Sequence, residues 1–234
     1  MSSNKIHAVI LARGGSKGIK NKNLILINKK ALIYWSIKAC LNTKKIKNVW
    51  VSSDSKRILE TAKKFGALTI KRPKNLSSDQ SSSESGWIHA IKEIKKKEKV
   101  NHVVVLQATS PIRGKDDLKE AIELFISKKS DSLFSSTTLD SHFTWQKIKG
   151  ELKANYNTLI KRKIRQNIKE KFIENGSFYI FSVEKFLKYK KRLFGKIINY
   201  NQDKVKSFEI DNKKDLIIVK SILKNIPKNS KIIN

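Results

Sequence analysis

Apolar residues along this chain gather into short runs that alternate with stretches of helical spacing. Residues 6–12 and 48–53 read as strands, and the nearly continuous apolar run at 102–107 predicts a buried strand, because a strand covered on both faces carries few polar side chains. Residues 32–40 and 55–65 repeat apolar positions every three or four residues, as amphipathic helices do. This alternation predicts a three-layer α/β fold with a doubly wound, mostly parallel sheet.

The same alternation continues as far as residue 138. A short strand at 68–71 comes before Pro73, and helices are expected at 85–97 and 115–128. Residues 132–138 read as another strand. Because the carboxyl ends of parallel strands share one edge of the sheet, we expect the loops that follow these strands to meet in one crevice.

The pattern breaks after residue 141. We expect a block of about residues 142–200 to leave the sheet as an excursion, with a strand at 176–181 and a helix at 183–190 inside it. A final strand at 207–211 and a final helix at 213–224 would then return to the main body. Residues 1–234 are therefore expected to form one domain with a small excursion.

A glycine-rich basic loop follows the first strand. Residues 12–23 contain three glycines together with Ser16, Arg13, Lys17 and Lys22. Glycine allows the backbone to approach a ligand closely, and successive N–H groups in such a turn can cradle anionic oxygens. The spacing fits neither G-x-x-x-x-G-K-[ST] nor G-x-G-x-x-G. The composition nevertheless predicts a loop that binds nucleotide phosphates.

Composition limits the class of protein and its compartment. The hydrophobic share of 39% is enough for a core, and no run of 18 apolar residues suggests a membrane span. The single Cys40 lies in an apolar helical pattern and excludes an intrachain disulfide framework. The first residues lead directly into the first strand without the pattern of a secretory signal. We therefore expect a cytoplasmic protein that does not insert into membranes.

The formal net charge of +31 raises the alternative of a basic, non-catalytic nucleic-acid-binding protein. The lysines are spread over predicted helix faces, as at 92–99 and 185–191, and are not confined to one stripe. We expect solvated lysine faces and no specific nucleic-acid partner. Whether the charge serves function or reflects codon bias stays open, but its field should attract anionic substrates.

The glycine-rich loop resembles a family signature. Residues 12–23 read A-R-G-G-S-K-G-I-K-N-K-N, which is similar to the A-R-G-G-S-K-G-I-x-x-K-N of the CMP-sialic acid synthetases. These N-acylneuraminate cytidylyltransferases include relatives that activate legionaminic and pseudaminic acids. Lys20 stands where the family usually has proline. The resemblance implies a Rossmann-like nucleotidyltransferase fold and a nucleotide-binding set of Ala12, Arg13, Gly14, Gly15, Ser16, Lys22 and Asn23.

Two further segments continue the resemblance. Residues 71–83 are similar to R-P-x-x-L-A-x-D-x-x-x-[ST], which implies that Arg72 and Ser83 help to hold the cytosine nucleotide. Residues 107–113 resemble L-Q-P-T-S-P-L-R, with alanine in place of the first proline, and place Gln107 beside an acid sugar.

Later residues resemble the sugar-binding part of the family. The stretch from Arg165 to residue 180 is similar to R-Q-(x)n-E-N-G-S-F-Y-I, and this variant resembles the legionaminic-type branch more than the animal enzymes. Arg165 could grip a sugar carboxylate bidentately or be one more cation in a basic run. Tyr179 is a further sugar contact, and Phe194 would contact the acyl groups of the sugar across a dimer interface. In the family the excursion crosses to a partner subunit, so a homodimer is expected.

Two carboxylates near the carboxyl end are candidate metal ligands. Glu209 and Asp211 are two positions apart on the predicted final strand, so both side chains would project from one face. Mg²⁺ is commonly bound by one or two carboxylates plus substrate phosphates. The alternative is that Asp211 caps the last helix. The pair resembles a D/E-I-D motif of the family.

The interpretation that joins these segments is a cytidylyltransferase. It would transfer CMP from CTP to the anomeric 2-hydroxyl of a nine-carbon 3-deoxy-2-keto acid sugar and release pyrophosphate, with Mg²⁺ or Mn²⁺ as cofactor. Arg13, Lys17, Lys22 and Asp211 are the expected catalytic residues, since phosphoryl-type transfer depends on positioning and charge stabilisation. A nearer alternative is a cytidylyltransferase for 3-deoxy-manno-octulosonate. The general base and the particular sugar stay open.

Overall fold

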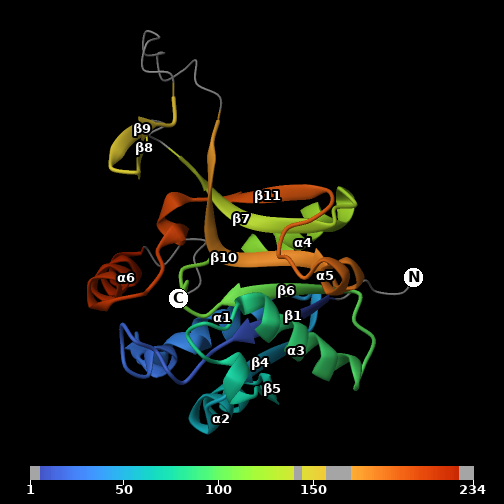
Figure 1. The fold of residues 1–234 in the computed structure, drawn as a ribbon. Coiled ribbons are helices and arrows are strands. Elements are labelled where there is room, and N and C mark those ends of the chain that lie inside the picture. The colour runs from blue at the N-terminus through green and yellow to red at the C-terminus, as the bar shows by residue number, and fades with distance from the viewer. Residues whose placement is uncertain (1–5, 140–143, 157–169, 227–234) are drawn as a thin grey trace.

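The computed structural model describes residues 6–139, 144–156 and 170–226. Within these ranges, seven strands form one sheet in the order β11-β7-β10-β6-β1-β4-β5, which can be followed down Figure 1. β10 is antiparallel to both of its neighbours, and the other strand pairs are parallel. The predicted mostly parallel α/β sheet is confirmed. The strands are β1 (Ile6–Leu11), β4 (Ile46–Ser53), β5 (Leu68–Lys71), β6 (His102–Gln107), β7 (Ser132–Thr138), β10 (Phe172–Ser182) and β11 (Ile197–Gln202).

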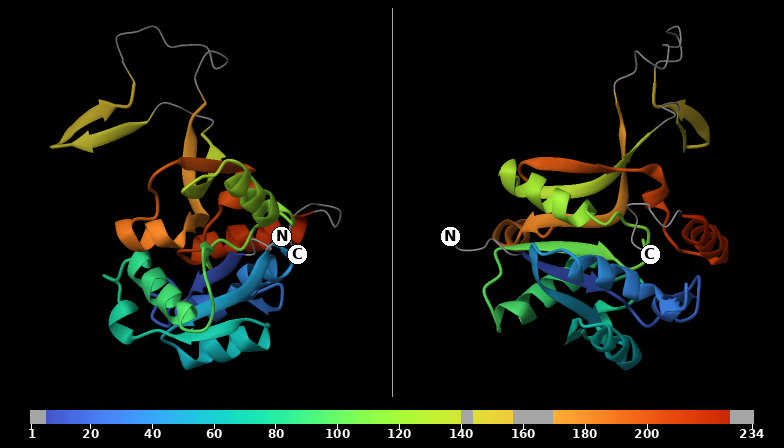
Figure 2. Two further views of the ribbon diagram at one scale, coloured as in Figure 1. Left: turned by 90° about the vertical axis from the view of Figure 1, so that its right-hand side faces the viewer. Right: turned by 180° about the vertical axis from the view of Figure 1, so that it is seen from behind.

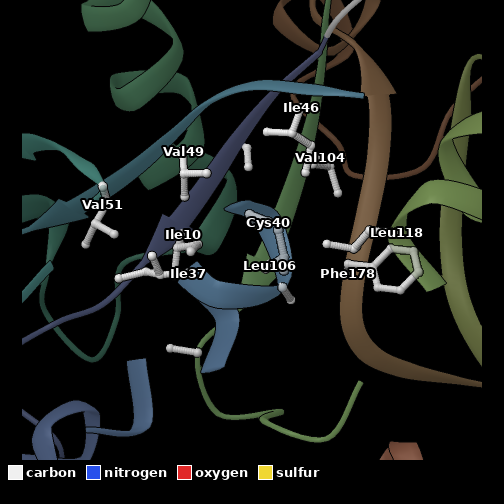
Figure 3. Close-up of a cluster of buried hydrophobic side chains, with 14 of the residues drawn as sticks. Ile10, Ile37, Cys40, Ile46, Val49, Val51, Val104, Leu106, Leu118 and Phe178 are labelled. Carbon is white, nitrogen blue, oxygen red and sulfur yellow. The ribbon is translucent and has the colours of Figure 1, made fainter. Parts of the chain in front are cut away.

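Helices cover both faces of the sheet, as the three-layer prediction requires. Side chains alternate along each strand, so Ile10, Val104 and Leu106 project to one face and pack with Ile37 and Leu118 of the covering helices (Figure 3). A second buried cluster fills the opposite face. The first face is covered by α1 (Leu32–Leu41), α2 (Lys56–Lys64) and α4 (Asp117–Ser127), and the second by α3 (Ser83–Lys95) and α5 (Val183–Tyr189).

The last part of the described chain returns beside its beginning. Ile210 and Val219 pack against Ile27, Leu32 and Trp35 in a third buried cluster. This contact holds the segment before the last helix next to the glycine-rich loop. The elements concerned are the hairpin of β2 (Leu26–Ile27) and β3 (Lys30–Ala31), helix α1 and the last helix α6 (Lys213–Asn225). The described chain also has three short 3-10 turns, η1 (Lys22–Leu24), η2 (Lys74–Leu76) and η4 (Lys204–Ser207).

The predicted strand at 207–211 is wrong. The 3-10 turn η4 ends at Ser207, and the next residues run irregularly into α6. The N–H of Ile210 donates to the carbonyl of Thr109, and the Ile210 side chain is fully buried. The buried Ile210 side chain, this backbone hydrogen bond and side-chain contacts of Glu209 and Asp211 hold the segment without a strand ladder.

The predicted excursion of about residues 142–200 is wrong at its carboxyl-terminal side. β10 lies between β6 and β7 in the sheet, and β11 forms the edge beside β7. The hairpin of β8 (Trp145–Ile148) and β9 (Glu151–Ala154) stands away from the body, near the beginning of β10 (Figure 1 and Figure 2). Both faces of β10 are buried where Phe178 and Tyr179 point to opposite sides, which is why this strand belongs to the core. Among the described helices, none has the length and apolar content needed to cross a membrane.

Candidate functional site

A cleft of about 440 Å³ opens where β1 and β6 end. The chain winds from β1 to β4 and β5 on one side, and β6 then pairs with the other side of β1. The order of strands therefore reverses between β1 and β6, and doubly wound sheets bind ligands outside the carboxyl ends of the strands at such a point. Leu11 and Gln107, the last residues of these two strands, both line the cleft.

The glycine-rich loop brings three cationic side chains to this cleft. Arg13, Lys17 and Lys22 all line it, together with Ser16. The Arg13 guanidinium lies 2.7 Å and the Lys17 ammonium 2.8 Å from opposite oxygens of Asp79. Hydrogen bonding from Lys17 lowers the pKa of Asp79 in spite of its exposure. A concentration of cations in one cleft suits a polyanionic ligand, as the sequence predicted.

Ala12 and Gly14, two residues of the predicted nucleotide-binding set, support the loop from inside and do not line the cleft. The N–H of Ala12 donates to the carbonyl of Ser52 at 3.1 Å. The N–H of Gly14 donates to Asp54 Oδ1 at 2.9 Å. These two amides are thus hydrogen-bonded inside the protein, and the place of Ala12 and Gly14 in the nucleotide-binding set stays a prediction. Gly15 has open space around its Cβ position.

Close backbone packing explains other residues of the loop. The side-chain amide of Asn23 donates to the carbonyl of Arg13 at 3.0 Å and is itself buried. Asn23 therefore shapes the loop as well as lining the cleft. A Cβ at Gly18 would lie 2.2 Å from the carbonyl oxygen of Asp211, so only glycine fits there. The loop and the segment before α6 consequently form one packed unit.

Arg72 and Ser83 both line the cleft, while their role in holding a cytosine nucleotide stays a prediction. Arg72 is 5% exposed, and its Nε donates to the Ser77 hydroxyl at 2.8 Å. Burial lowers the pKa of Arg72, and the nearby Asp54 carboxylate opposes this effect. Ser83 is the first residue of α3, whose cap is the preceding Ser82. Helix amino termini attract negative groups, which adds to the positive character of the cleft.

Asp211 reaches the cleft and pairs with Lys22. Its Oδ1 lies 3.0 Å from Lys22 Nζ, and its side chain is 68% exposed. The capping alternative is settled by two other residues, because Asn212 and Asp215 form a reciprocal capping box at the start of α6. Asp211 is therefore free to act at the cleft.

A second hollow of about 520 Å³ lies on the other side of Gln107. Gln107 lines both hollows, which makes it the point where they meet. Gly176 has φ +67°, and a Cβ there would lie 2.7 Å from Glu209 Oε1 and 3.2 Å from Gln107 Nε2. Only glycine allows these side chains to approach so closely. The full lining is Gln107, Thr137, Ile173, Glu174, Asn175, Gly176, Tyr179, Lys204, Ser207, Phe208 and Glu209.

Glu209 and Asp211 are the residues that could hold a metal ion. Glu209 Oε1 accepts a hydrogen bond from the Ser110 hydroxyl at 3.0 Å. Burial raises the pKa of Glu209, the Ser110 hydrogen bond opposes this, and the neighbouring Asp211 carboxylate raises it further. In the described ranges, no three His, Cys, Asp or Glu side chains gather into a closed metal cage. Asp211 lines the cleft and Glu209 lines the second hollow, so the structure does not give them the shared strand face that the sequence predicted. Mg²⁺ needs no closed cage where substrate phosphates supply oxygens, so Asp211 at the cleft fits it as a single carboxylate ligand.

The predicted sugar contacts have three different outcomes. Tyr179 lines the second hollow, and its contact with a sugar stays a prediction. Phe194 is wrong as a sugar contact, because it is 6% exposed and its ring packs near Phe181 in the second buried cluster of its own chain. The Phe194 N–H also donates a hydrogen bond to the Ser132 hydroxyl, which in turn donates to the Phe194 carbonyl. Arg165 lies outside the described residues.

Arg113 is a supporting residue that the sequence reasoning missed. It is 1% exposed, and it donates to the Ser36 hydroxyl at 2.9 Å and to the carbonyls of Gln107 and Ser177 at 2.8 Å each. Burial lowers the pKa of Arg113 to about 10, so the side chain stays protonated at neutral pH. It ties the end of β6 to β10 beneath the point where the hollows meet. The sequence signal that could have identified Arg113 is its position at the end of the segment 107–113, which resembles the family motif.

Comparison with known proteins agrees with this arrangement. The model of a family described as Cytidylyltransferase matches residues 7–231. An N-acylneuraminate cytidylyltransferase of Oncorhynchus mykiss is 37% identical over 182 residues, which are 76% of this chain and 41% of the relative. A pseudaminic acid cytidylyltransferase of Campylobacter jejuni is 42% identical over 134 residues, which are 56% of this chain and 58% of the relative. The chain thus spans about half the length of these curated relatives.

A solved structure shares the fold. A CMP:2-keto-3-deoxy-manno-octonic acid synthetase complexed with CTP superposes with a TM-score of 0.68 at 15% identity. The match covers 94% of this chain and 98% of that one. At this identity the likeness concerns the fold alone, and it agrees with the sheet order described above.

Proposed function

This chain belongs to the cytidylyltransferase family, and from that premise we propose that it transfers CMP from CTP to a nonulosonic acid. The acceptor would be the anomeric 2-hydroxyl of a nine-carbon 3-deoxy-2-keto acid sugar of the sialic, legionaminic or pseudaminic type. Its oxygen bonds to the α-phosphorus while the bond from that phosphorus to the pyrophosphate oxygen breaks. The observation that carries the proposal is the meeting of a cationic cleft and a second hollow at Gln107.

The cleft supplies what the nucleotide would need. Arg13 and Lys17 would bind the triphosphate, and they would exchange their contact with Asp79 for phosphate oxygens. Lys22, 15% exposed beside Asp211, would neutralise charge that develops on the α-phosphate and on the leaving pyrophosphate. Such groups act mainly by positioning and charge stabilisation. Arg72 and Ser83 on the opposite wall would hold the cytosine nucleotide.

Mg²⁺ is the cofactor that we propose for this reaction. Asp211 on the cleft wall would hold the ion, and Glu209, which lines the second hollow, is the other candidate ligand. When bound, the ion would neutralise negative charge on the phosphate oxygens. Lys22 would then keep Asp211 oriented through their ion pair.

The second hollow would receive the acid sugar. Its lining combines the apolar Ile173 and Phe208 with amide and carboxylate groups, as a sugar with acyl substituents requires. Gln107 at the junction would place the anomeric centre near the nucleotide. Arg165 remains our candidate for the sugar carboxylate.

We also propose a homodimer that forms through the β8–β9 hairpin. Trp145, Ile148 and Leu152 on this hairpin are 51%, 42% and 67% exposed, and Phe172 at the start of β10 is 41% exposed. The strand pairing puts Trp145 and Leu152 on one face of the hairpin and Ile148 on the other, and exposed apolar side chains commonly mark protein interfaces. Sedimentation at working concentration should show a dimer, and Leu152→Asp together with Ile148→Asp should shift it to monomer. A wild-type protein that sediments as a monomer would contradict this part of the proposal.

A substrate matrix tests the proposed activity. Pyrophosphate release is measured with each of CTP, UTP, ATP and GTP against sialic, legionaminic and pseudaminic acids and 3-deoxy-manno-octulosonate, with Mg²⁺ present. We expect release with CTP and at least one nine-carbon acid. Release only with the eight-carbon acid would replace the sugar class, and no release with any acid would contradict the proposal.

A further inference from the structure

Arg192 lies between α5 and β11 and lines neither hollow. Its Nε donates to Glu84 Oε1 at 2.7 Å, and its Nη1 donates to the hydroxyl of Tyr179 at 3.3 Å. The Glu84 side chain, in the first turn of α3, is 18% exposed. An ion pair at this depth, with a second hydrogen bond from the same planar group, holds the guanidinium in one orientation.

The Arg192 guanidinium also contacts a wall of each hollow. Its central carbon lies 5.4 Å from the centroid of the Trp87 ring and 5.2 Å from that of Tyr179. Both distances are within the range of cation–π attraction. Trp87 lines the cationic cleft, and Tyr179 lines the second hollow. Arg192 therefore contacts both Trp87 in the wall of the cleft and Tyr179 in the wall of the second hollow.

Tyr179 extends this chain of contacts to the second hollow. Its hydroxyl donates a short hydrogen bond to Glu174, whose side chain lines that hollow. Burial raises the pKa of Tyr179, and the Glu174 carboxylate raises it further, so the hydroxyl keeps its proton and continues to donate. Arg192 thereby supports the orientation of the Glu174 carboxylate through Tyr179.

We propose that Arg192 is a positioning residue for the acid sugar, acting through Tyr179 on Glu174; this inference rests on the function proposed above. A carboxylate accepts hydrogen bonds from the hydroxyl and amide N–H groups of such a sugar. Trp87 has other support, since its ring also lies against Phe181 and Phe186. Loss of Arg192 should therefore disturb the second hollow much more than the cleft.

Arg192→Lys is the test variant, because lysine keeps a charge beside Glu84 but lacks the planar fork. We expect the KM for the acid sugar to rise about tenfold and the KM for CTP to change less than about twofold, a split that a general loss of stability does not produce. Arg57→Lys, on the exposed face of α2, is the matched control and should leave both values unchanged.

A second variant asks whether the effect passes through Tyr179. Tyr179→Phe keeps the ring and removes the hydroxyl, so it should raise the KM for the acid sugar alone. The double variant should be no worse than the more affected single variant, because coupled residues are not additive. The inference is overturned if the KM for the acid sugar is unchanged in both single variants, or if their effects add in the double variant. In either case a wild type that is active leaves the proposed function standing. A wild type inactive with every acid overturns the proposed function and this inference with it. If Arg192→Lys fails to fold, the sugar KM of Tyr179→Phe decides.

Discussion

The cationic cleft and the second hollow share Gln107 but offer a ligand different chemistry. The cleft presents Arg13, Lys17 and Lys22 from one glycine-rich loop. The second hollow presents apolar, amide and carboxylate groups from β6, β7, β10 and the residues from η4 to Glu209. A cleft of this kind recognises charge, which acts over several ångströms, whereas the hollow recognises shape and hydrogen-bond pattern. Under the proposed function, substitutions in the cleft should affect turnover and substitutions in the hollow should affect sugar affinity.

The largest effect is expected at Lys22. Lys22→Ala removes a charge that should act mostly in the transition state, so kcat should fall at least about 100-fold, or ~2.7 kcal/mol, with the fold intact. Turnover is measured by pyrophosphate release, and the fold by circular dichroism. Lys20→Ala, two positions away and exposed, is the control and should behave as wild type. Unchanged turnover in Lys22→Ala would remove this residue from the mechanism.

Substitutions of Asp211 and Asp215 should separate an effect on activity from an effect on the stability of α6. Asp211→Ala should lower activity about tenfold or more and raise the Mg²⁺ concentration needed for half-maximal rate, because it removes a hard oxygen ligand. Asp215→Ala breaks the capping box and should cost ~1 kcal/mol of unfolding free energy with activity largely kept. Urea unfolding and metal titrations measure the two effects. Full activity of the wild type in excess chelator would contradict the metal assignment.

The smallest effect is expected in the second hollow. Phe208, 39% exposed on its wall, offers apolar surface to a bound acyl group. Phe208→Ala should raise the KM for the acid sugar roughly threefold to tenfold, the equivalent of ~1 kcal/mol of lost burial, with the KM for CTP unchanged. Steady-state kinetics with each substrate varied in turn gives both values. An equal rise in both KM values would erase the proposed division between the hollows.

The same division explains what the sequence could predict. The strands β1, β4 and β6 and the glycine-rich loop follow from local signals, since a continuous apolar run and clustered glycines are visible in a short window. β11 was missed because this edge strand carries several polar side chains and only one neighbour supports it. Its place in the sheet depends on contacts with β7, which no short window contains.

Contacts between residues far apart in the sequence also determine which candidate residues lie at the site. Phe194 was assigned to a sugar pocket by resemblance, but its packing near Phe181 in the second buried cluster places it in the core. Asp211 and the cap of α6 could not be told apart in the sequence, because Asn212 and Asp215 offer the same chemistry next to it. Asp79 and Arg113 act through partners far along the chain.

The most direct test of the proposed function is the product itself. Wild-type protein, CTP, Mg²⁺ and each nonulosonic acid carrying ¹⁸O at the anomeric hydroxyl are incubated, and the products are identified by mass spectrometry. The account predicts a CMP-linked acid that retains the label in its phosphoester bond, in amounts that match the pyrophosphate released, and very little of it with Lys22→Ala. Pyrophosphate release without a CMP-linked acid, or no reaction with any of the acids, would contradict it.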